Sequence, residues 1–123
     1  MSLEELRNAI DATITTPYLV SVGDDGRPHC VSVSITWTEE ALATGVGNTT
    51  FTNAVTRPLV TLVWPPSELG GHSLIVDATA AAADGPRRQL RLNPTGAVLH
   101  RTVTVPGAAP STDDSDCRPL SDP

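Results

Sequence analysis

The residues best suited to binding chemistry lie in residues 45–53, with the sequence GVGNTTFTN. Two glycines let the backbone approach a ligand closely, and the side chains of Asn48, Thr49 and Thr50 can donate hydrogen bonds. If a helix begins here, its first backbone N–H groups lack intrahelical partners and its dipole favours an anion, so a phosphate group would bind there. The same residue types are also ordinary helix caps, and the stretch alone does not decide between the two roles.

A strand before this stretch and a helix within it would position these groups. Residues 41–47, ALATGVG, are predicted to form a strand that leads directly into it. Residues 50–56 are predicted to be helical, and the helix ends because Pro58 disfavours helical geometry at Arg57. The anion cradle is therefore expected at a junction between a strand and a helix.

The remaining sequence predicts a strand-rich domain with one more helix. Ser2 and Glu5 form a capping-box pattern ahead of apolar residues at helical spacing, which predicts a helix over residues 2–12. An Asp-Gly turn between two β-branched runs predicts a hairpin. The order β-β-β-α-β-β-β is typical of a small antiparallel barrel. The predicted strands are residues 18–22, 29–36, 41–47, 59–64, 73–83 and a last strand through QLRL and AVLHRTVTV that NPTG interrupts.

Composition and charge limit the partners of the chain. Its 123 residues suit one domain, and with 39% hydrophobic but only 3% aromatic residues the core must be aliphatic. The formal net charge of -6 repels the phosphate backbone of a nucleic acid. No segment has the apolar length of a membrane span, and the N-terminus lacks the pattern of a signal peptide. We expect a cytoplasmic protein that binds neither nucleic acid nor membrane.

Neither a metal site nor a catalytic side chain is expected from the motifs. Cys30 and Cys117 lie in unlike surroundings, which predicts two free thiols. His29 beside Cys30 does not complete a zinc site, because no second Cys/His pair follows at suitable spacing. No Gly-x-Ser-x-Gly turn is present to expose a serine nucleophile.

The last part of the chain differs in kind from the rest. Residues 106–123, PGAAPSTDDSDCRPLSDP, contain four prolines and four aspartates against one arginine, which gives a net charge of -3. So little apolar surface does not offset the entropy of ordering the chain. We therefore expect a barrel domain over residues 1–105 and a flexible acidic tail over residues 106–123, unless a partner orders that tail.

The order of these motifs resembles the pyridoxamine 5'-phosphate oxidase-like group, the FMN-binding split barrels. The segments that carry the resemblance are PYLVSVGDDGRPHCVSVSI, ALATGVGNTTFTNAVTRPLVTLVWPP and AVLHR. It covers about residues 3–101, which is nearly everything except the tail.

The resemblance implies a six-stranded antiparallel split barrel that forms a homodimer, with an FMN in each of two clefts at the interface. It implies that the outward face of the second strand lies near the isoalloxazine ring, and that the end of the third strand and the start of the helix hold the ribityl phosphate. The ring-side residues are Ser32, Ser34 and Thr36, and the phosphate-side residues are Ala43, Thr44, Asn48, Thr49, Thr50 and Asn53.

This chain departs from the oxidases themselves at the phosphate. They carry Arg and Lys where this chain has apolar or hydroxylic residues, and a neutral cradle binds a dianion more weakly. Arg57, or an arginine of a partner subunit such as Arg87, Arg88 or Arg101, would compensate. The chain is also short of the C-terminal segment with which the oxidases recognise pyridoxal phosphate, so vitamin B6 oxidation is not expected.

Together these features predict a flavin-dependent oxidoreductase that passes hydride or electrons to a small organic molecule. The flavin would carry the chemistry, so no catalytic side chain is assigned, although His100 could donate a proton near a flavin. Three alternatives stay open: a deazaflavin-dependent reductase, a flavin-binding protein without turnover, and a dimeric interaction module without cofactor.

Overall fold

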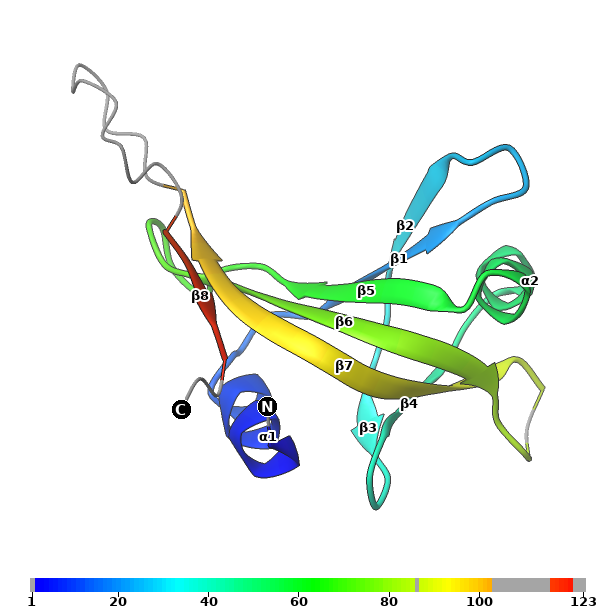
Figure 1. Cartoon of the computed structure of the whole chain (residues 1–123), viewed down its shortest axis with the longest axis horizontal. Coiled ribbons are helices and arrows are strands. Elements are labelled where there is room, and N and C mark those ends of the chain that lie inside the picture. The colour runs from blue at the N-terminus through cyan, green and yellow to red at the C-terminus, as the bar shows by residue number, and fades with distance from the viewer. Residues whose placement is uncertain (1, 86, 103–115, 121–123) are drawn as a thin grey trace.

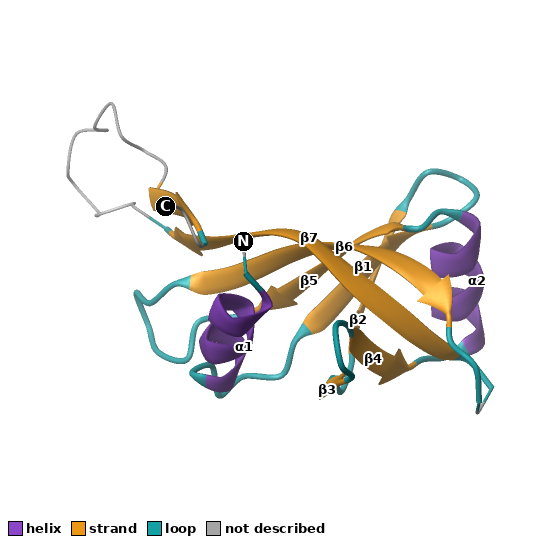
Figure 2. Cartoon of the chain, turned by 60° about the horizontal axis from the view of Figure 1, so that its bottom comes forward, coloured by secondary structure: helices purple, strands orange, loops and turns teal. Residues whose placement is uncertain are grey.

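The computed structural model describes residues 2–85, 87–102 and 116–120, and these form one curled antiparallel sheet with two short helices (Figures 1 and 2). The elements in chain order are α1 (Leu3–Asp11), β1 (Tyr18–Val22), β2 (Pro28–Ser32), β3 (Thr36–Trp37), β4 (Leu42–Gly45), α2 (Asn48–Thr56), β5 (Leu59–Trp64), β6 (Ser73–Ala82), β7 (Gln89–Arg101) and β8 (Asp116–Pro119).

The strands pair in the order β2-β1-β5-β6-β7-β4-β3, and β8 pairs with the second half of β7. The three long strands β5, β6 and β7 run side by side across the molecule, with α1 near one end and α2 at the other (Figure 1). β4 pairs with the first half of β7, from Leu42↔Leu92 to Gly45↔Gln89, and this pairing brings the strand before α2 beside the strand after the β6–β7 loop.

Both predicted helices form, α1 within one residue of the predicted bounds 2–12 and α2 two residues earlier than the predicted start at residue 50. The Ser2 hydroxyl accepts a hydrogen bond from the Glu5 backbone N–H at 3.1 Å, and Leu6 buries its side chain completely under the sheet. α2 follows Gly47 and stops at Arg57, whose backbone is extended ahead of Pro58. The Asp-Gly hairpin between β1 and β2 also forms as predicted, with Gly26 at a φ of 79° in its turn.

The core is aliphatic, as the composition predicts. Alternate residues of β5 and β6 point inward, so that Leu62, Leu74 and Val76 are almost fully buried while their neighbours face outward. Each buried Leu or Val side chain stabilises the fold by roughly 1.5–3 kcal/mol relative to an exposed one. Trp64, 3% exposed, is the aromatic member of this core.

Three strand predictions differ from the structure. The predicted strand over residues 29–36 is broken after Ser32, where the Val33 N–H bonds the Pro17 carbonyl at 3.0 Å, and a separate two-residue strand β3 follows. β4 ends at Gly45 rather than at residue 47. NPTG does not interrupt β7, because Asp77 pairs with Gly96 and Ala78 with Pro94, so Thr95 is accommodated as a bulge. With β8, the described sheet has eight strands instead of six.

Part of the predicted tail belongs to the sheet. The backbone of residues 116–119 pairs with β7 from Arg101↔Asp116 to Val98↔Pro119, and the Leu120 N–H bonds the Ala97 carbonyl at 2.8 Å. Leu120 packs against the core and is partly buried. Residues 106–115 and 121–123 lie outside the described residues, so flexibility there stays a prediction.

Two features bear on the classes considered from sequence. Neither described helix combines the length with the apolar character that a bilayer crossing requires. Among the described side chains, no three of the His, Cys, Asp and Glu types gather closely enough to hold a metal ion. Cys30 is an exposed free thiol.

Candidate functional site

A cavity of about 550 Å³ is lined by residues of β2, the junction of β4 with α2, and the β6–β7 loop. These segments are far apart in the chain, and the pairing of β4 with β7 brings the last two together. The cavity is lined by His29, Val31, Ser32, Val33, Gly45, Val46, Gly47, Asn48, Thr49, Thr50, Arg87 and Arg88.

One wall of this cavity is the N-terminal end of α2. The residue before the helix is Gly47, which has no side chain to cap it, and the first helical bond of the ladder runs from the Phe51 N–H to the Gly47 carbonyl at 3.0 Å. The N–H groups of Asn48, Thr49 and Thr50 therefore have no intrahelical acceptor. The helix dipole adds a partial positive charge at this end, so the wall is suited to an anion.

The β6–β7 loop adds two full positive charges to the same cavity. Arg87 and Arg88 are both exposed, and among the residues that the structure describes neither forms an ion pair with a carboxylate. The Val46 N–H bonds the Arg88 carbonyl at 3.0 Å, which fixes the loop to the β4–α2 junction. The backbone of Arg88 has a φ of 58°, an uncommon value for a residue other than glycine.

These arginines correct the expectation of a neutral cradle. We expected any compensating arginine among Arg87, Arg88 and Arg101 to come from a partner subunit, but the structure places the first two in the cavity of their own chain. The sequence contained no signal for this, because the loop that carries them is separated from α2 by two strands.

A second cavity, of about 460 Å³, adjoins the first. It is lined by Asn48, Phe51, Ala83, Gly85, Arg87 and Arg88. Asn48 and the two arginines therefore line both cavities, and a ligand with more than one anionic group could contact them from both sides.

The wall formed by β2 is largely apolar. Val31 and Val33 line it together with His29 and Ser32, and Val33 is 7% exposed. We considered His29 from the sequence only as a metal ligand; the structure places its imidazole in the cavity instead, on the same side of β2 as Val31. The alternation of side chains along a strand could have indicated this position, because residues 29, 31 and 33 lie on the same side of the chain.

Six of the ten residues predicted for the site do not line the cavity. They lie between β2 and β3, on β3 and β4, or in the second half and at the end of α2: Ser34, Thr36, Ala43, Thr44, Asn53 and Arg57. The Thr44 hydroxyl is buried and donates to the Ser34 carbonyl at 2.7 Å, and the Thr36 hydroxyl donates to the Ala43 carbonyl at 3.4 Å. Asn53 is 8% exposed and its amide donates to the Ser21 hydroxyl at 3.4 Å. These polar groups satisfy one another within the chain.

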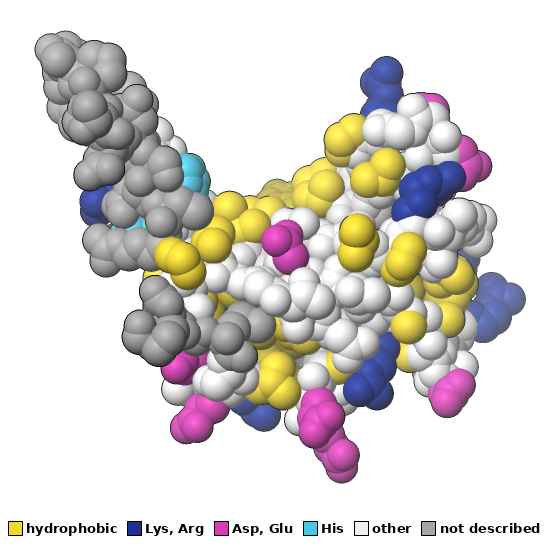
Figure 3. Space-filling model, viewed as in Figure 1, with side chains coloured by type: hydrophobic (Ala, Val, Ile, Leu, Met, Phe, Trp, Pro, Cys, Tyr) yellow, Lys and Arg dark blue, Asp and Glu magenta, His cyan; other side chains and the backbone are white. Residues whose placement is uncertain are grey.

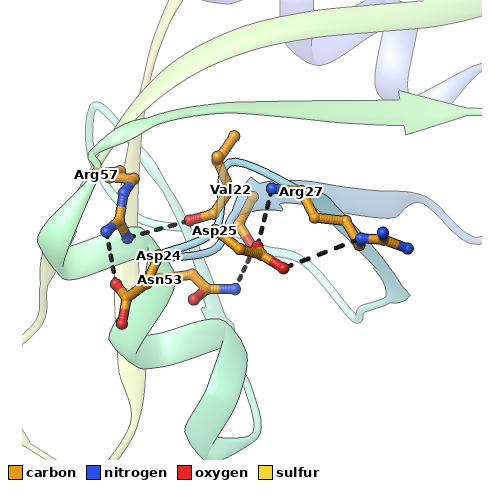
Figure 4. A network of polar contacts seen from close by, with 7 residues as sticks. Val22, Asp24, Asp25, Arg27, Asn53 and Arg57 are labelled. Carbon is orange, nitrogen blue, oxygen red and sulfur yellow. Dashed lines mark hydrogen bonds and ion pairs between the residues drawn. The ribbon is translucent and has the colours of Figure 1, made fainter.

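Arg57 also lies away from the cavity, at the other end of α2. Its guanidinium pairs with the Asp24 carboxylate at 2.5 Å and donates to the Val22 carbonyl at 3.4 Å, so it fastens the β1–β2 hairpin to the helix (Figure 4). Ser32, Asn48, Thr49 and Thr50 are thus the predicted site residues that the structure brings together.

The cavity joins a cationic, amide-rich end to an apolar wall. Such a surface can hold an anionic group at the start of α2 while an apolar, planar body lies against Val31 and Val33. Besides the arginines, His29 is the titratable side chain among the described lining residues, and it could exchange a proton with a bound molecule.

No family model matches the chain. Two curated proteins are similar to it in sequence: the uncharacterized protein Mb0449c of Mycobacterium bovis and the uncharacterized protein MT0457 of Mycobacterium tuberculosis. Each is 38% identical to this chain, over a region that covers 68% of the chain and 69% of the relative.

Three solved structures share the fold at low sequence identity. An F420 reductase has a TM-score of 0.54 at 15% identity and covers 69% of this chain and 90% of its own. HutZ, a heme storage protein from Vibrio cholerae, has a TM-score of 0.58 at 17% identity, and the alignment covers 77% of this chain and 92% of HutZ. The hypothetical protein Rv2991 from Mycobacterium tuberculosis has a TM-score of 0.56 at 17% identity, and the alignment covers 70% of this chain and 56% of Rv2991. These neighbours confirm the predicted fold class, a split β-barrel.

Proposed function

We propose a function from the premise that this chain belongs to the same family as the uncharacterized mycobacterial proteins Mb0449c and MT0457. In this proposal the cavity between β2, the start of α2 and the β6–β7 loop binds FMN. The protein is then a flavin-dependent oxidoreductase of the pyridoxamine 5'-phosphate oxidase-like group, acting on a small molecule.

One observation carries the proposal: the uncapped start of α2 and the side chains of Arg87 and Arg88 line the same cavity. Backbone N–H groups and guanidinium groups are the donors that a phosphate dianion prefers, and charge-assisted bonds are about twice as strong as neutral ones. The ribityl phosphate would therefore be held by the amides of residues 48–50 and by the two arginines.

The apolar wall suits the other end of the cofactor. Val31 and Val33 would contact the isoalloxazine ring and exclude water from one of its sides, and the Ser32 hydroxyl could donate to a ring oxygen or nitrogen. FMN supplies hydride or electron transfer when it is bound, so the protein's tasks are to bind, orient and shield it. The exposed free thiol of Cys30 suits a reducing compartment, and we place the protein in the cytoplasm.

We also propose that the active form is a homodimer. Tyr18 is 43% and Leu59 is 77% exposed on β1 and β5, and hydrophobic side chains gather over the sheet in Figure 3. Tyr18 pairs with Ser32 in the β1–β2 hairpin, so this apolar surface leads to the rim of the cavity. A second copy on this surface would close the open side of the site; sedimentation of the purified protein at several concentrations tests it.

A deazaflavin is the second candidate cofactor, and the adjoining cavity favours it. Because Asn48, Arg87 and Arg88 line both cavities, a cofactor with an acidic extension beyond its phosphate could occupy both. One of the structural neighbours is an F420 reductase. The chain would then be a deazaflavin-dependent reductase.

Comparing FMN with riboflavin tests the proposal most directly, because the two differ only in the phosphate. We expect FMN to bind at least about a hundredfold more tightly than riboflavin, as measured by quenching of flavin fluorescence, and we expect the double variant Arg87→Ala, Arg88→Ala to remove most of that difference. Equal affinities for FMN and riboflavin would contradict the phosphate site.

Parallel titrations separate the alternatives. Tighter binding of F420 than of FMN would assign the protein to the deazaflavin-dependent reductases. A preparation that binds heme instead, detected by its Soret absorbance band, would exclude a flavin function. Indifference to all three would support an interaction module without cofactor, and FMN binding without turnover of an added reductant would support a flavin-binding protein that is not an enzyme.

A further inference from the structure

His29 is an ionisable residue of the candidate cofactor cavity to which the proposed function gives no role. Among the lining residues that the structure describes, it is the one besides the arginines whose side chain can carry a positive charge. It is half-buried and lies on the same side of the chain as Val31 and Val33, the residues proposed to contact the isoalloxazine ring. His29 therefore belongs to the wall on which that ring would lie.

The spacing of these residues sets which of them one ring can contact. Side chains two residues apart on a strand share a face and lie about 7 Å from each other. Isoalloxazine consists of three fused rings, so a ring that packs on Val31 extends toward His29 at one end and toward Val33 at the other. One bound ring would therefore contact all three side chains.

The polarity of the wall favours one orientation of the ring. Val33 is 7% exposed and packs with the core, so it suits the dimethylbenzene end of isoalloxazine, which has no polar atoms. The imidazole of His29 can donate hydrogen bonds, so it suits the pyrimidine end, which carries carbonyl oxygens. The reverse orientation would place those oxygens against Val33, where burying an unpaired polar group is costly.

The charges around His29 allow its imidazole to be protonated when FMN is bound. Across the β1–β2 pair it faces Ser21, a buried neutral residue whose hydroxyl accepts the Asn53 amide at 3.4 Å. The lining residues at the start of α2 are also neutral, and the charges of Arg87 and Arg88 would be balanced by the phosphate dianion. The charged residues at the hairpin turn form two ion pairs, Arg27 with Asp25 and Arg57 with Asp24.

Two electrons and one proton convert FMN into a reduced form with the new proton on N5 and a negative charge on the pyrimidine end. An imidazolium beside that end forms a charge-assisted hydrogen bond with the anion, which is stronger than its bond to the neutral oxidised ring. We propose, on the premise that FMN binds in this cavity, that protonated His29 contacts the pyrimidine end and binds reduced FMN at least about tenfold more tightly, relative to oxidised FMN, than a neutral side chain would.

The midpoint potential of bound FMN tests this role without any substrate. The protein with FMN is reduced by dithionite beside a redox dye of known potential, and both absorbance spectra are followed. His29→Gln keeps a hydrogen-bond donor and removes the charge, so at about pH 6 its potential should be lower by at least about 30 mV, which corresponds to tenfold for two electrons. Equal potentials in the two proteins would overturn the proposal.

The pH dependence separates a charge on His29 from a packing effect. At about pH 9 the imidazole of the original chain is largely neutral as well, so the difference from His29→Gln should mostly disappear. His29→Lys stays charged at both pH values and should keep the higher potential at both. A difference from His29→Gln that persists at about pH 9, or a Lys variant that behaves like the Gln variant, would overturn the role of the charge.

His100→Gln is the matched control. His100 lies at the opposite end of β7 from the loop with Arg87 and Arg88 and lines neither cavity, so this variant should keep the original potential. An equal fall in this variant would refute a local effect of His29.

The flavin affinities distinguish a failure of this role from a failure of the proposed function. FMN that does not bind, or that binds no more tightly than riboflavin, would refute both. Phosphate-dependent binding of FMN with equal potentials in the original chain and His29→Gln would refute the role of His29 alone. Oxidised FMN should bind to His29→Gln within about threefold of the original affinity, which shows that the site is intact.

Discussion

The two ends of helix α2 use similar residue types for different purposes. In the C-terminal half of α2, Asn53 donates a hydrogen bond to Ser21, and at its C-terminal end Arg57 pairs with Asp24, so these polar groups are satisfied within the chain (Figure 4). At its start, Asn48 and the amides of the first turn face a cavity that Arg87 and Arg88 also line. Residue type alone therefore does not identify a binding residue. A polar side chain is free to bind a ligand only if its hydrogen bonds are not already made within the chain.

This difference explains which predicted site residues line the cavity. Asn53 and Arg57 carry the same functional groups as Asn48 and Arg87, but their hydrogen bonds hold the helix to the β1–β2 hairpin. A ligand that bound them would have to break those bonds first. The groups at the start of the helix would bind an anion, as we propose, without that cost.

The largest effect is expected from removing the charges at the start of α2. Arg87→Ala combined with Arg88→Ala should weaken FMN binding about a hundredfold or more, because two charge-assisted contacts of roughly 1.5–3 kcal/mol each are lost. Isothermal titration measures the affinity, and thermal unfolding of the variant should change little, since both residues are exposed. If the FMN affinity of the double variant stays within about threefold of the original, the start of α2 does not hold the phosphate through these arginines.

In the C-terminal half of α2, substitution of the buried Asn53 should affect the stability of the fold instead of ligand binding. Asn53→Ala should lower the free energy of unfolding by about 1–3 kcal/mol, because it removes the partner of the buried Ser21 hydroxyl. Urea unfolding measures this change, and Thr52→Ala, at the exposed neighbouring position of the helix, is the control. A loss of FMN affinity in Asn53→Ala at unchanged stability would restore the residue to the binding site.

A negative charge at the start of the helix should change stability and binding in opposite directions. Thr49 is exposed in the first turn, so Thr49→Asp should stabilise the free protein by about 0.3–1 kcal/mol through the helix dipole. The same carboxylate repels a phosphate, and FMN affinity should fall about tenfold. Thr49→Asn is the neutral control for both measurements, and an affinity that falls equally in both variants would argue against an anion at this position.

The smallest effect is expected for the ion pair at the end of the helix. Asp24 has a side-chain exposure of 90% and Arg57 of 35%, so a double-mutant cycle of Asp24→Asn and Arg57→Ala should give a coupling free energy of about 1 kcal/mol or less. The coupling should decrease at high salt. A value of several kcal/mol would mean that this end of α2 contributes more to the fold than the exposure of the pair indicates.

Much of the fold followed from local patterns. The capping residues of α1, the Asp-Gly turn after β1 and the proline after α2 each act on their near neighbours. The start of α1 lies within one residue of its expected position, and the turn and the end of α2 lie where expected. The errors concern places where distant strands decide. Residues 93–96 look like a turn, but pairing with β6 keeps them in β7 with a bulge, and residues 116–119 gain partners only because β7 presents an open edge.

The candidate site was predictable only in part for the same reason. Asn48, Thr49 and Thr50 could be chosen because a helix start follows from the sequence around it. Thr44 and Asn53 were chosen by the same criteria, yet their partners Ser34 and Ser21 come from other strands and consume their hydrogen bonds. No local pattern records such a contact.

By itself, the sequence determined a small antiparallel β-barrel, the two helices, the aliphatic core and the approximate start of α2, because periodicity, caps and turns depend on residues that are close along the chain. Tertiary structure alone decided that Arg87 and Arg88 line the cavity at that helix start and that Arg57 does not. The physical reason is that these contacts arise from the antiparallel pairing of β4 with β7, which joins segments whose sequences carry no information about each other.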